Sequence, residues 1–186
     1  MTRLIRLDGS EFRAIAGPAA SVYGEAMRRS PEVVVQRRDI IAGHAGYPGF
    51  CCAAVFDGYE IGVAANSGGT TGSLVGFGYG YLGASGQWWH DTVAHALGRE
   101  RSRRWLRDAF ELAELHVLPA HQGSGLGRRL LTDVLAQTQA HQALLSTPDT
   151  ESPARLLYRS WGFEDLLCGF TFPGSSEAYA IMGVDL

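Results

Sequence analysis

A glycine-rich turn that joins a strand to a helix constrains this chain more than any other feature of its sequence. The segment 110–118 predicts a β-strand, and Gly123, Gly125 and Gly127 separate it from an amphipathic helix expected over 127–141. Such a turn directs unpaired backbone N–H groups and the positive end of the helix dipole at one point, which suits a phosphate. The segment therefore predicts a strand–turn–helix unit of a mixed α/β fold with an anion site.

Two common phosphate-binding motifs do not fit this turn. A dinucleotide-binding fold needs a third glycine where Arg128 stands, and Asp149, at a passable distance for the acidic partner, follows a proline in an expected loop. A nucleotide-triphosphate loop needs a lysine, and all sixteen basic residues of the chain are arginine. The same composition excludes Schiff-base chemistry and a lysine general base.

Length and composition predict one globular domain spanning residues 1–186. The hydrophobic share of 46% is enough to build a core, so whole-chain disorder is excluded. No apolar run reaches the roughly 18 residues that a membrane-spanning helix needs, and the charged N-terminus does not resemble a signal peptide. We therefore expect a cytoplasmic protein with no membrane partner.

Charge and cysteine content exclude further classes. A net charge of −3 argues against a general nucleic-acid binder. Three cysteines, at positions 51, 52 and 168, are too few for a disulfide framework, and we expect them to be buried free thiols in a reducing compartment. Neither CxxC nor HxxxH occurs, so no metal site is expected.

Hydrophobic patterns elsewhere predict strands and helices in alternation. Strands are expected at 4–7, 50–56, 59–65, 74–82, 143–146, 163–172 and 178–184, with a loop at 66–73. Helices are expected at 10–29, 33–41, 87–107 and 153–161. We expect Ser10 and Ser152 to cap helices and the last two strands to pair antiparallel.

One expected strand carries glycine at every second position. Gly76, Gly78 and Gly80 leave one face of the strand 74–82 without side chains. Such a face admits close approach of a ligand or, more simply, of a neighbouring helix.

Two motifs in this order resemble the GNAT superfamily of acyl-CoA-dependent N-acetyltransferases. LHVLP at 115–119 followed by QGSGLG at 122–127 resembles the acyl-CoA signature of that family. SPARLLYRSWGF at 152–163 is similar to the family's A-x-x-L-Y-x-x-x-G-F helix. The resemblance covers 110–165, and it implies a mostly antiparallel central sheet, splayed between strands ending near Val117 and Ser146, with helices on both faces. The segment 87–107 would then be an inserted helical segment.

The resemblance also implies roles for individual residues, with acetyl-CoA as cosubstrate. Val117 would offer backbone hydrogen bonds to the pantetheine arm, and the amides from Gly123 to Arg128 would hold the diphosphate. The implied cofactor-binding residues are Leu115, His116, Val117, Gln122, Gly123, Ser124, Gly125, Leu126, Gly127 and Arg128. Tyr158 would protonate the departing thiolate, which is chemically reasonable for a hydroxyl whose ordinary pKa is about 10.

A strand carboxylate is the expected general base, because the amine must lose a proton to react. Glu111 and Glu114 are the candidates. Strand alternation places Glu111 on the face of Val117 and Glu114 on the opposite face. In some family members the base lies six residues before the Val117 position, which favours Glu111 and leaves Glu114 open. Burial would raise the pKa of either carboxyl.

The expected acceptor is a primary amine of a small molecule or peptide that attacks directly in a ternary complex. Candidate acceptor contacts are Tyr47, Trp88, Trp89 and His90, although core packing also explains at least one tryptophan. The five arginines within 99–107 would attract an acidic acceptor or form a solvated helix face. Residues 145–147 and Glu151 depart from relatives that acetylate protein N-termini, which argues against a ribosomal-protein type of substrate.

Other functions remain open at this level. A domain that senses acyl-CoA without turnover is the main alternative, and an enzyme that uses a longer acyl chain is another. Tyr158 together with a strand carboxylate favours the enzyme. A homodimer formed through the C-terminal strands is compatible with the family resemblance.

Overall fold

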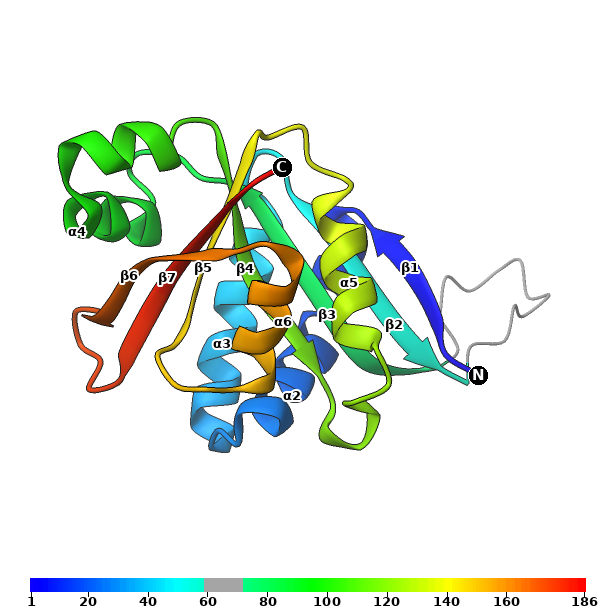
Figure 1. Cartoon of the computed structure of the whole chain (residues 1–186). Helices are drawn as coiled ribbons and strands as arrows, with labels where there is room; N and C mark the ends of the chain where they lie inside the picture. Colours follow the sequence, from blue (N-terminus) through cyan, green and yellow to red (C-terminus); the bar gives the residue numbers. More distant parts are fainter. Residues whose placement is uncertain (59–71) are drawn as a thin grey trace. The chain divides into compact units, whose positions relative to one another are not determined.

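The computed structural model describes residues 1–58 and 72–186 (Figure 1). The strands are β1 (Arg3–Leu7), β2 (Cys51–Asp57), β3 (Ser73–Leu82), β4 (Ala109–Val117), β5 (Gln142–Pro148), β6 (Glu164–Thr171) and β7 (Ala178–Asp185). The helices are α1 (Gly9–Ala14), α2 (Ala16–Met27), α3 (Pro31–His44), α4 (Trp88–Trp105), η1 (Pro119–His121, a 3₁₀ turn), α5 (Leu126–Leu135) and α6 (Pro153–Trp161). The expected strand 59–65 and most of the expected loop 66–73 lie outside the described residues.

The strands form one open sheet in the order β1-β2-β3-β4-β5-β7-β6 (Figure 1). The pairs β1/β2, β5/β7 and β6/β7 are antiparallel, and β4/β5 is parallel. The predicted mixed α/β sheet and the C-terminal antiparallel pair are therefore confirmed. The parallel ladder joins Ala109–Glu111 to Gln142–Leu144, and both strands continue beyond it.

The chain divides into two compact units, and β3 and β4 contribute residues to both. The first unit holds residues 1–79 and 114–137, and the second holds residues 80–113 and 138–186.

In the first unit, helices cover both faces of the strands. The ring of Phe12 from α1 lies 5.0 Å from the ring of Tyr79. On the opposite face, a Cβ atom placed on Gly76 or Gly78 would lie 3.3 Å from Leu130 or 3.6 Å from Val134 of α5. The glycine face of β3 is thus filled by helix packing, the simpler of its two interpretations.

In the second unit, α4 packs on β5, β6 and β7. Val93, Leu97 and Trp105 of α4 share a buried cluster with Leu144 and Ile181 of the strands. Val184 lies three residues after Ile181 on β7, so strand alternation places its side chain on the opposite face of the sheet. On that other face a Cβ atom at Gly162, which ends α6, would lie 3.6 Å from Val184.

Several local expectations need correction. Asp8, not Ser10, caps α1. The Asp8 carboxylate accepts hydrogen bonds from the backbone amides of Ser10 and Glu11, and the Glu11 carboxylate accepts one from the Asp8 amide, which forms a capping box. The helix expected over 127–141 ends at Leu135, and the Thr138 hydroxyl accepts the Ala140 amide in a turn that competes with helix.

Of the remaining local expectations, most are confirmed and one is wrong. Ser152 caps α6 as predicted, by accepting the amide of Arg155 at 3.2 Å. All three cysteines are free, and Cys51 and Cys52 are buried as expected. Cys168 is exposed, contrary to expectation, because it lies where β6 departs from regular pairing with β7.

Candidate active site

The turn between β4 and α5 presents backbone amides to solvent. Gly123 and Gly125 have φ values of +75° and +83°, a left-handed conformation that favours glycine. Gly125 is the N-cap of α5 and has no side chain to bind the first amides of the helix, which also lack intrahelical partners. The residues 122–125 are exposed. Exposed backbone amides at a helix N-terminus are an arrangement that can bind an anion.

The turn is held in place and has room for a ligand. The Gln122 side-chain amide donates to the Val117 carbonyl at 2.9 Å, and the Ser124 hydroxyl donates to the His121 carbonyl at 2.6 Å. A Cβ atom placed on Gly123 or Gly125 would meet no atom within 4 Å. The donor set of amides plus the exposed Arg128 therefore fits a diphosphate.

Other residues implied in cofactor binding differ in what they can offer. Leu126 is buried, and the side chains of Leu115 and Val117 pack toward β3, so their backbone groups are what a ligand can reach. The His116 ring binds Glu114 instead of facing a ligand freely.

An extra residue in β4 changes the predicted faces of the two carboxylates. A Cβ atom placed on Gly80 would contact the Glu111 carbonyl oxygen, and one on Gly78 would lie 3.5 Å from the Glu114 carbonyl oxygen. Two residues along β3 thus correspond to three along β4, as in a β-bulge. The prediction of opposite faces is wrong, because the side chains that contact Glu111 and Glu114 belong to one face of the strands.

Glu114 is a buried carboxylate held by two basic side chains of the first unit. Arg37 from α3 places its Nε 2.8 Å from one carboxylate oxygen, and His116 Nε2 donates to the other. The guanidinium of Arg37 also lies 4.8 Å above the ring of Tyr23. Burial raises the pKa of Glu114, but the His116 hydrogen bond and the charges of His116 and Arg37 outweigh it, so the pKa falls below its usual value.

His44 and Tyr47 lie at the end of α3 in the same unit. His44 Nδ1 is 3.0 Å from the Tyr79 hydroxyl, and the His44 ring lies 5.4 Å from the ring of Tyr47, which is 36% exposed. Burial lowers the pKa of His44, so its neutral form is favoured at pH 7. Tyr47 is the acceptor candidate that this unit presents at its surface.

Glu111 is a buried carboxylate of the second unit. It accepts a hydrogen bond from the Tyr81 hydroxyl at 2.9 Å. Tyr81, Tyr79 and Phe77 are two residues apart along β3, so their side chains share one face of that strand. The Phe77 ring lies 5.6 Å from the ring of His116, which is the partner of Glu114. These contacts are the reason to assign both carboxylates to one face of β4.

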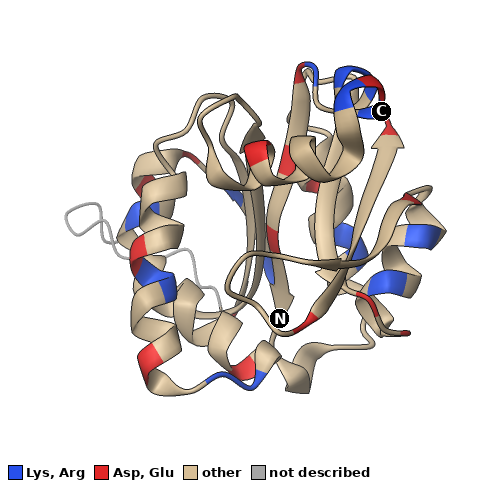
Figure 2. Ribbon diagram, turned by 90° about the vertical axis from the view of Figure 1, so that its left-hand side faces the viewer, with Lys and Arg blue, Asp and Glu red and all other residues tan. Residues whose placement is uncertain are grey.

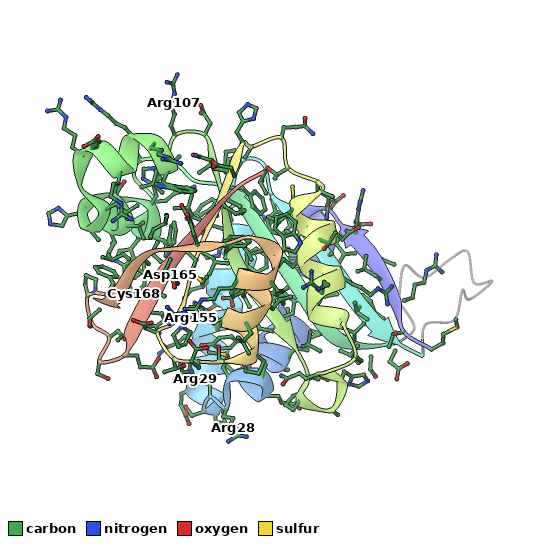
Figure 3. The ribbon with its side chains drawn as sticks, in the orientation of Figure 1. Arg28, Arg29, Arg107, Arg155, Asp165 and Cys168 are labelled. Atoms are coloured by element: carbon green, nitrogen blue, oxygen red, sulfur yellow. The ribbon has the colours of Figure 1, made fainter. Side chains whose placement is uncertain are left out.

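Tyr158 lies on α6 in the second unit, with its ring 5.8 Å from that of Phe163, and it is buried. Three residues earlier, the buried Arg155 binds Asp149 and Asp165, which ties α6 to the loop after β5 and to β6 (Figure 3). Residues three apart share a helix face, so these ion pairs also position Tyr158.

The other acceptor candidates lie together at the start of α4. Trp88 is 60% exposed, with its ring 5.5 Å from Phe172. The Trp89 indole N–H donates to the Ser146 hydroxyl at 3.1 Å, and His90 Nδ1 lies 3.0 Å from the Asp91 carboxylate. Trp89 packs partly into the core, and Trp88 stays accessible.

Sequence reasoning missed Arg37, Tyr81 and Arg155, which hold the candidate catalytic groups. Arg37 and Tyr81 have no pattern of their own in the sequence, because the carboxylates that they contact belong to another segment of the chain. The spacing of Arg155 three residues before Tyr158 was the one available signal.

The described part of the chain has no helix with the length and apolar character needed to cross a membrane. Within residues 1–58 and 72–186, no group of three or more His, Cys, Asp or Glu side chains is arranged to hold a metal ion.

Comparison with known proteins gives one consistent family. A family model described as an acetyltransferase (GNAT) domain matches residues 34–165. A GCN5-like protein acetyltransferase of Mycobacterium tuberculosis is 35% identical over 200 residues, which cover 97% of this chain and 96% of that protein.

Solved structures agree on the fold. The ribosomal-protein-S18-alanine N-acetyltransferase of Escherichia coli has a TM-score of 0.63 at 15% identity, covering 100% of this chain and 94% of its own. A Salmonella typhimurium protein solved with its cofactor acetyl-CoA has a TM-score of 0.59 at 16% identity, covering 99% and 93%.

Proposed function

The chain belongs to the GNAT superfamily of acetyltransferases, and on that premise we propose that it transfers acetyl from acetyl-CoA to a primary amine of a peptide or protein. The open turn at 122–127 carries the proposal, because its exposed amides suit the diphosphate of coenzyme A. We further propose that residues 1–186 act as one acetyltransferase domain, with α4 as an insertion.

The cosubstrate is bound mainly by backbone. The amides from Gly123 to Arg128 hold the diphosphate, and the Arg128 guanidinium adds a charge-assisted contact. Val117 offers its backbone to the pantetheine arm, while its carbonyl also fixes Gln122.

The reaction is a direct transfer in a ternary complex. The neutral amine nitrogen attacks the thioester carbonyl carbon, and the tetrahedral intermediate collapses with cleavage of the carbon–sulfur bond. The Tyr158 hydroxyl gives its proton to the departing thiolate, and the base takes the proton that the amine nitrogen loses. Exchange with solvent then restores both groups.

Glu111 is the proposed base. Glu114 is the weaker candidate, because its charge is committed to Arg37 and His116 and its pKa is lowered, which reduces its ability to accept a proton. Glu111 accepts a hydrogen bond from the Tyr81 hydroxyl, a donor that brings no positive charge to the carboxylate.

The name of the relative and the exposed ring of Trp88 support the proposed acceptor class. The Mycobacterium tuberculosis relative is named a protein acetyltransferase, which supports a lysine side chain or another peptide amine as acceptor. Tyr47, Trp88, Trp89 and His90 are the proposed acceptor contacts.

A thiol-release assay tests this function. Acetyl-CoA is incubated with the protein and, separately, a lysine peptide with a blocked N-terminus, a lysine-free peptide with a free N-terminus, and a polyamine. We expect amine-dependent thiol release, matched by gain of one acetyl group in mass spectrometry, with Tyr158→Phe retaining CoA binding and losing most turnover. CoA binding without release for any amine would contradict the proposal and favour an acyl-CoA-sensing domain.

A further inference from the structure

The second half of α4 carries an arginine surface that neither the CoA site nor the acetyl-transfer chemistry uses. Gly98, with φ +75° and ψ 169°, breaks α4 into two parts. The first part buries Val93 and Leu97, and the second part bears arginine at 99, 101, 103 and 104, with Arg107 just beyond its end. Figure 2 shows these basic residues gathered near the C-terminus of the chain.

This segment reverses the charge of the rest of the protein. It holds five arginines against Glu100 and Asp108, in a chain whose net charge is −3. Two of the five arginines contact other parts of the protein. Arg101 donates a hydrogen bond to the Leu166 carbonyl, and the Arg104 guanidinium lies 5.1 Å above the Trp105 ring.

The other three are available to a partner. Within residues 1–58 and 72–186, neither Arg99 nor Arg103 forms an ion pair or a side-chain hydrogen bond. Arg107 lies 3.7 Å from Asp108 yet remains 85% exposed, and Figure 3 shows it pointing away from the ribbon. We name Arg99, Arg103 and Arg107 the arginine face.

Helix stability does not explain the arginine face. Arg99 and Arg103 are four residues apart, where like charges repel and destabilise a helix slightly. Arg99 also follows Gly98 directly, in the first turn of the second part, where the helix dipole disfavours a cation. Arg103, in contrast, lies in the last turn of α4, where the dipole favours a cation.

The arginine face is also separate from the carboxylates nearby. A hollow between α4 and β6 is lined by Glu100, Glu164 and Asp165 among others. Trp105, which also lines that hollow, is buried, and helical spacing turns Arg99 and Arg103 away from it. An acidic partner on the arginine face therefore does not have to approach those carboxylates.

We propose that the arginine face docks an acidic segment of the acceptor protein, beside the amine that is acetylated. Guanidinium groups bind carboxylates with two parallel hydrogen bonds, and Arg99 and Arg103 lie about one helical turn apart, so that each can bind a carboxylate of one peptide. The net negative charge of the chain disfavours a nucleic acid, whose dense phosphates interact with the whole surface.

The same helix links the arginine face to the proposed acceptor contacts. Trp88, Trp89 and His90 form the first turn of α4, and Trp89 is fixed to Ser146 of β5. An acidic segment on the second part of α4 would thus select lysines at a set distance along the peptide. This inference rests on the proposed function for its role in catalysis, but the docking itself does not.

Steady-state kinetics with paired peptides tests the catalytic role. Two blocked peptides carry one lysine followed by a run of glutamates or of glutamines. We expect the KM of the glutamate peptide to be about tenfold lower, as two exposed charged contacts would give, with similar kcat. The advantage should fall with added salt and disappear in R99E/R103E and in R99Q/R103Q. The control R38E alters an exposed arginine of α3 that pairs with Asp39, and it should keep the advantage.

Binding measured without chemistry separates this inference from the proposed function. Fluorescence anisotropy with a labelled, lysine-free glutamate peptide should report binding to the wild type and to R38E, with a loss of about tenfold in R99E/R103E. Binding without acetylation of any peptide would overturn the proposed function and leave the docking surface standing. Equal binding by the wild type and R99E/R103E would overturn the docking surface, and so would tighter binding of an RNA oligonucleotide of the same charge.

Discussion

The two halves of β4 place a buried carboxylate in very different surroundings. In the half that belongs to the second unit, Glu111 accepts a hydrogen bond from the neutral hydroxyl of Tyr81. In the half that belongs to the first unit, Glu114 is held by Arg37 and His116. One strand thus carries one carboxylate beside a neutral donor and another fixed in an ion pair.

The difference teaches which group can do chemistry. Cations beside a carboxylate lower its pKa and therefore its affinity for a proton. Such a carboxylate is better suited to stabilising the fold than to acting as a general base. The difference in environment, not in residue type, therefore supports Glu111 as the proposed base.

The largest expected effect breaks the comparison at Glu111. Glu111→Gln keeps shape and the Tyr81 contact but removes the base, so kcat should fall about 10³-fold with little change in CoA affinity. The deficit should shrink as pH rises, because more of the amine is then neutral. Steady-state kinetics across pH checks this, and a wild-type kcat in the variant would transfer the base role elsewhere.

The same substitution at Glu114 should affect folding instead. Glu114→Gln leaves the Arg37 charge without its buried partner, which should lower the free energy of unfolding by about 3 kcal/mol. The kcat of the folded variant should stay close to wild type. Urea denaturation with kinetics below the transition measures both, and loss of kcat with unchanged stability would exchange the two roles.

The dependence of stability on acid pH tests the ion-paired state of Glu114. The pKa of Glu114 is lowered from 4.5, so the unfolded state binds its proton first as pH falls. The stability that this group supplies is complete above 4.5 and is lost as pH falls through the lower folded value.

Unfolding by urea between neutral and acid pH measures that slope. Asp149 and Asp165 also have lowered pKa values and give their own acid loss, so the wild type and Glu114→Gln are compared. The variant should lose less stability than the wild type on acidification; parallel curves would argue against an ion-paired Glu114.

The smallest expected effect concerns the turn that follows β4. Gln122→Ala removes the hydrogen bond to the Val117 carbonyl and loosens the turn. One such bond is worth about 1 kcal/mol, so the KM for acetyl-CoA should rise about fivefold while kcat holds. A fall in kcat at saturating acetyl-CoA would show that the turn acts on the chemical step.

Much of this architecture could be predicted from local sequence signals. The strand–turn–helix segment and the cap at Ser152 depend on nearby residues, and both are where the sequence predicts them. The glycine row of β3 likewise anticipated close packing, although only the structure identifies α5 as the neighbour.

Long-range features could not be predicted in the same way. The extra residue in β4 is visible only against β3, so simple alternation misassigned the faces of Glu111 and Glu114. Arg37 and Tyr81 come from segments distant from the carboxylates they contact, and no periodicity marks them, whereas the helical spacing of Arg155 and Tyr158 is visible in the sequence. The charged and hydrogen-bonding partners of the candidate catalytic groups therefore could be identified only from the folded structure.

Calorimetric titration with coenzyme A and with pantetheine tests most directly whether the turn at 122–127 binds the diphosphate. The two ligands share the thiol arm, and only coenzyme A carries the diphosphate. The account predicts clear heat for coenzyme A and far weaker binding for pantetheine, with the difference largely lost when Gly123 and Gly125 are both changed to Ala. Equal affinity for the two ligands, or no heat for either at millimolar concentration, would contradict it.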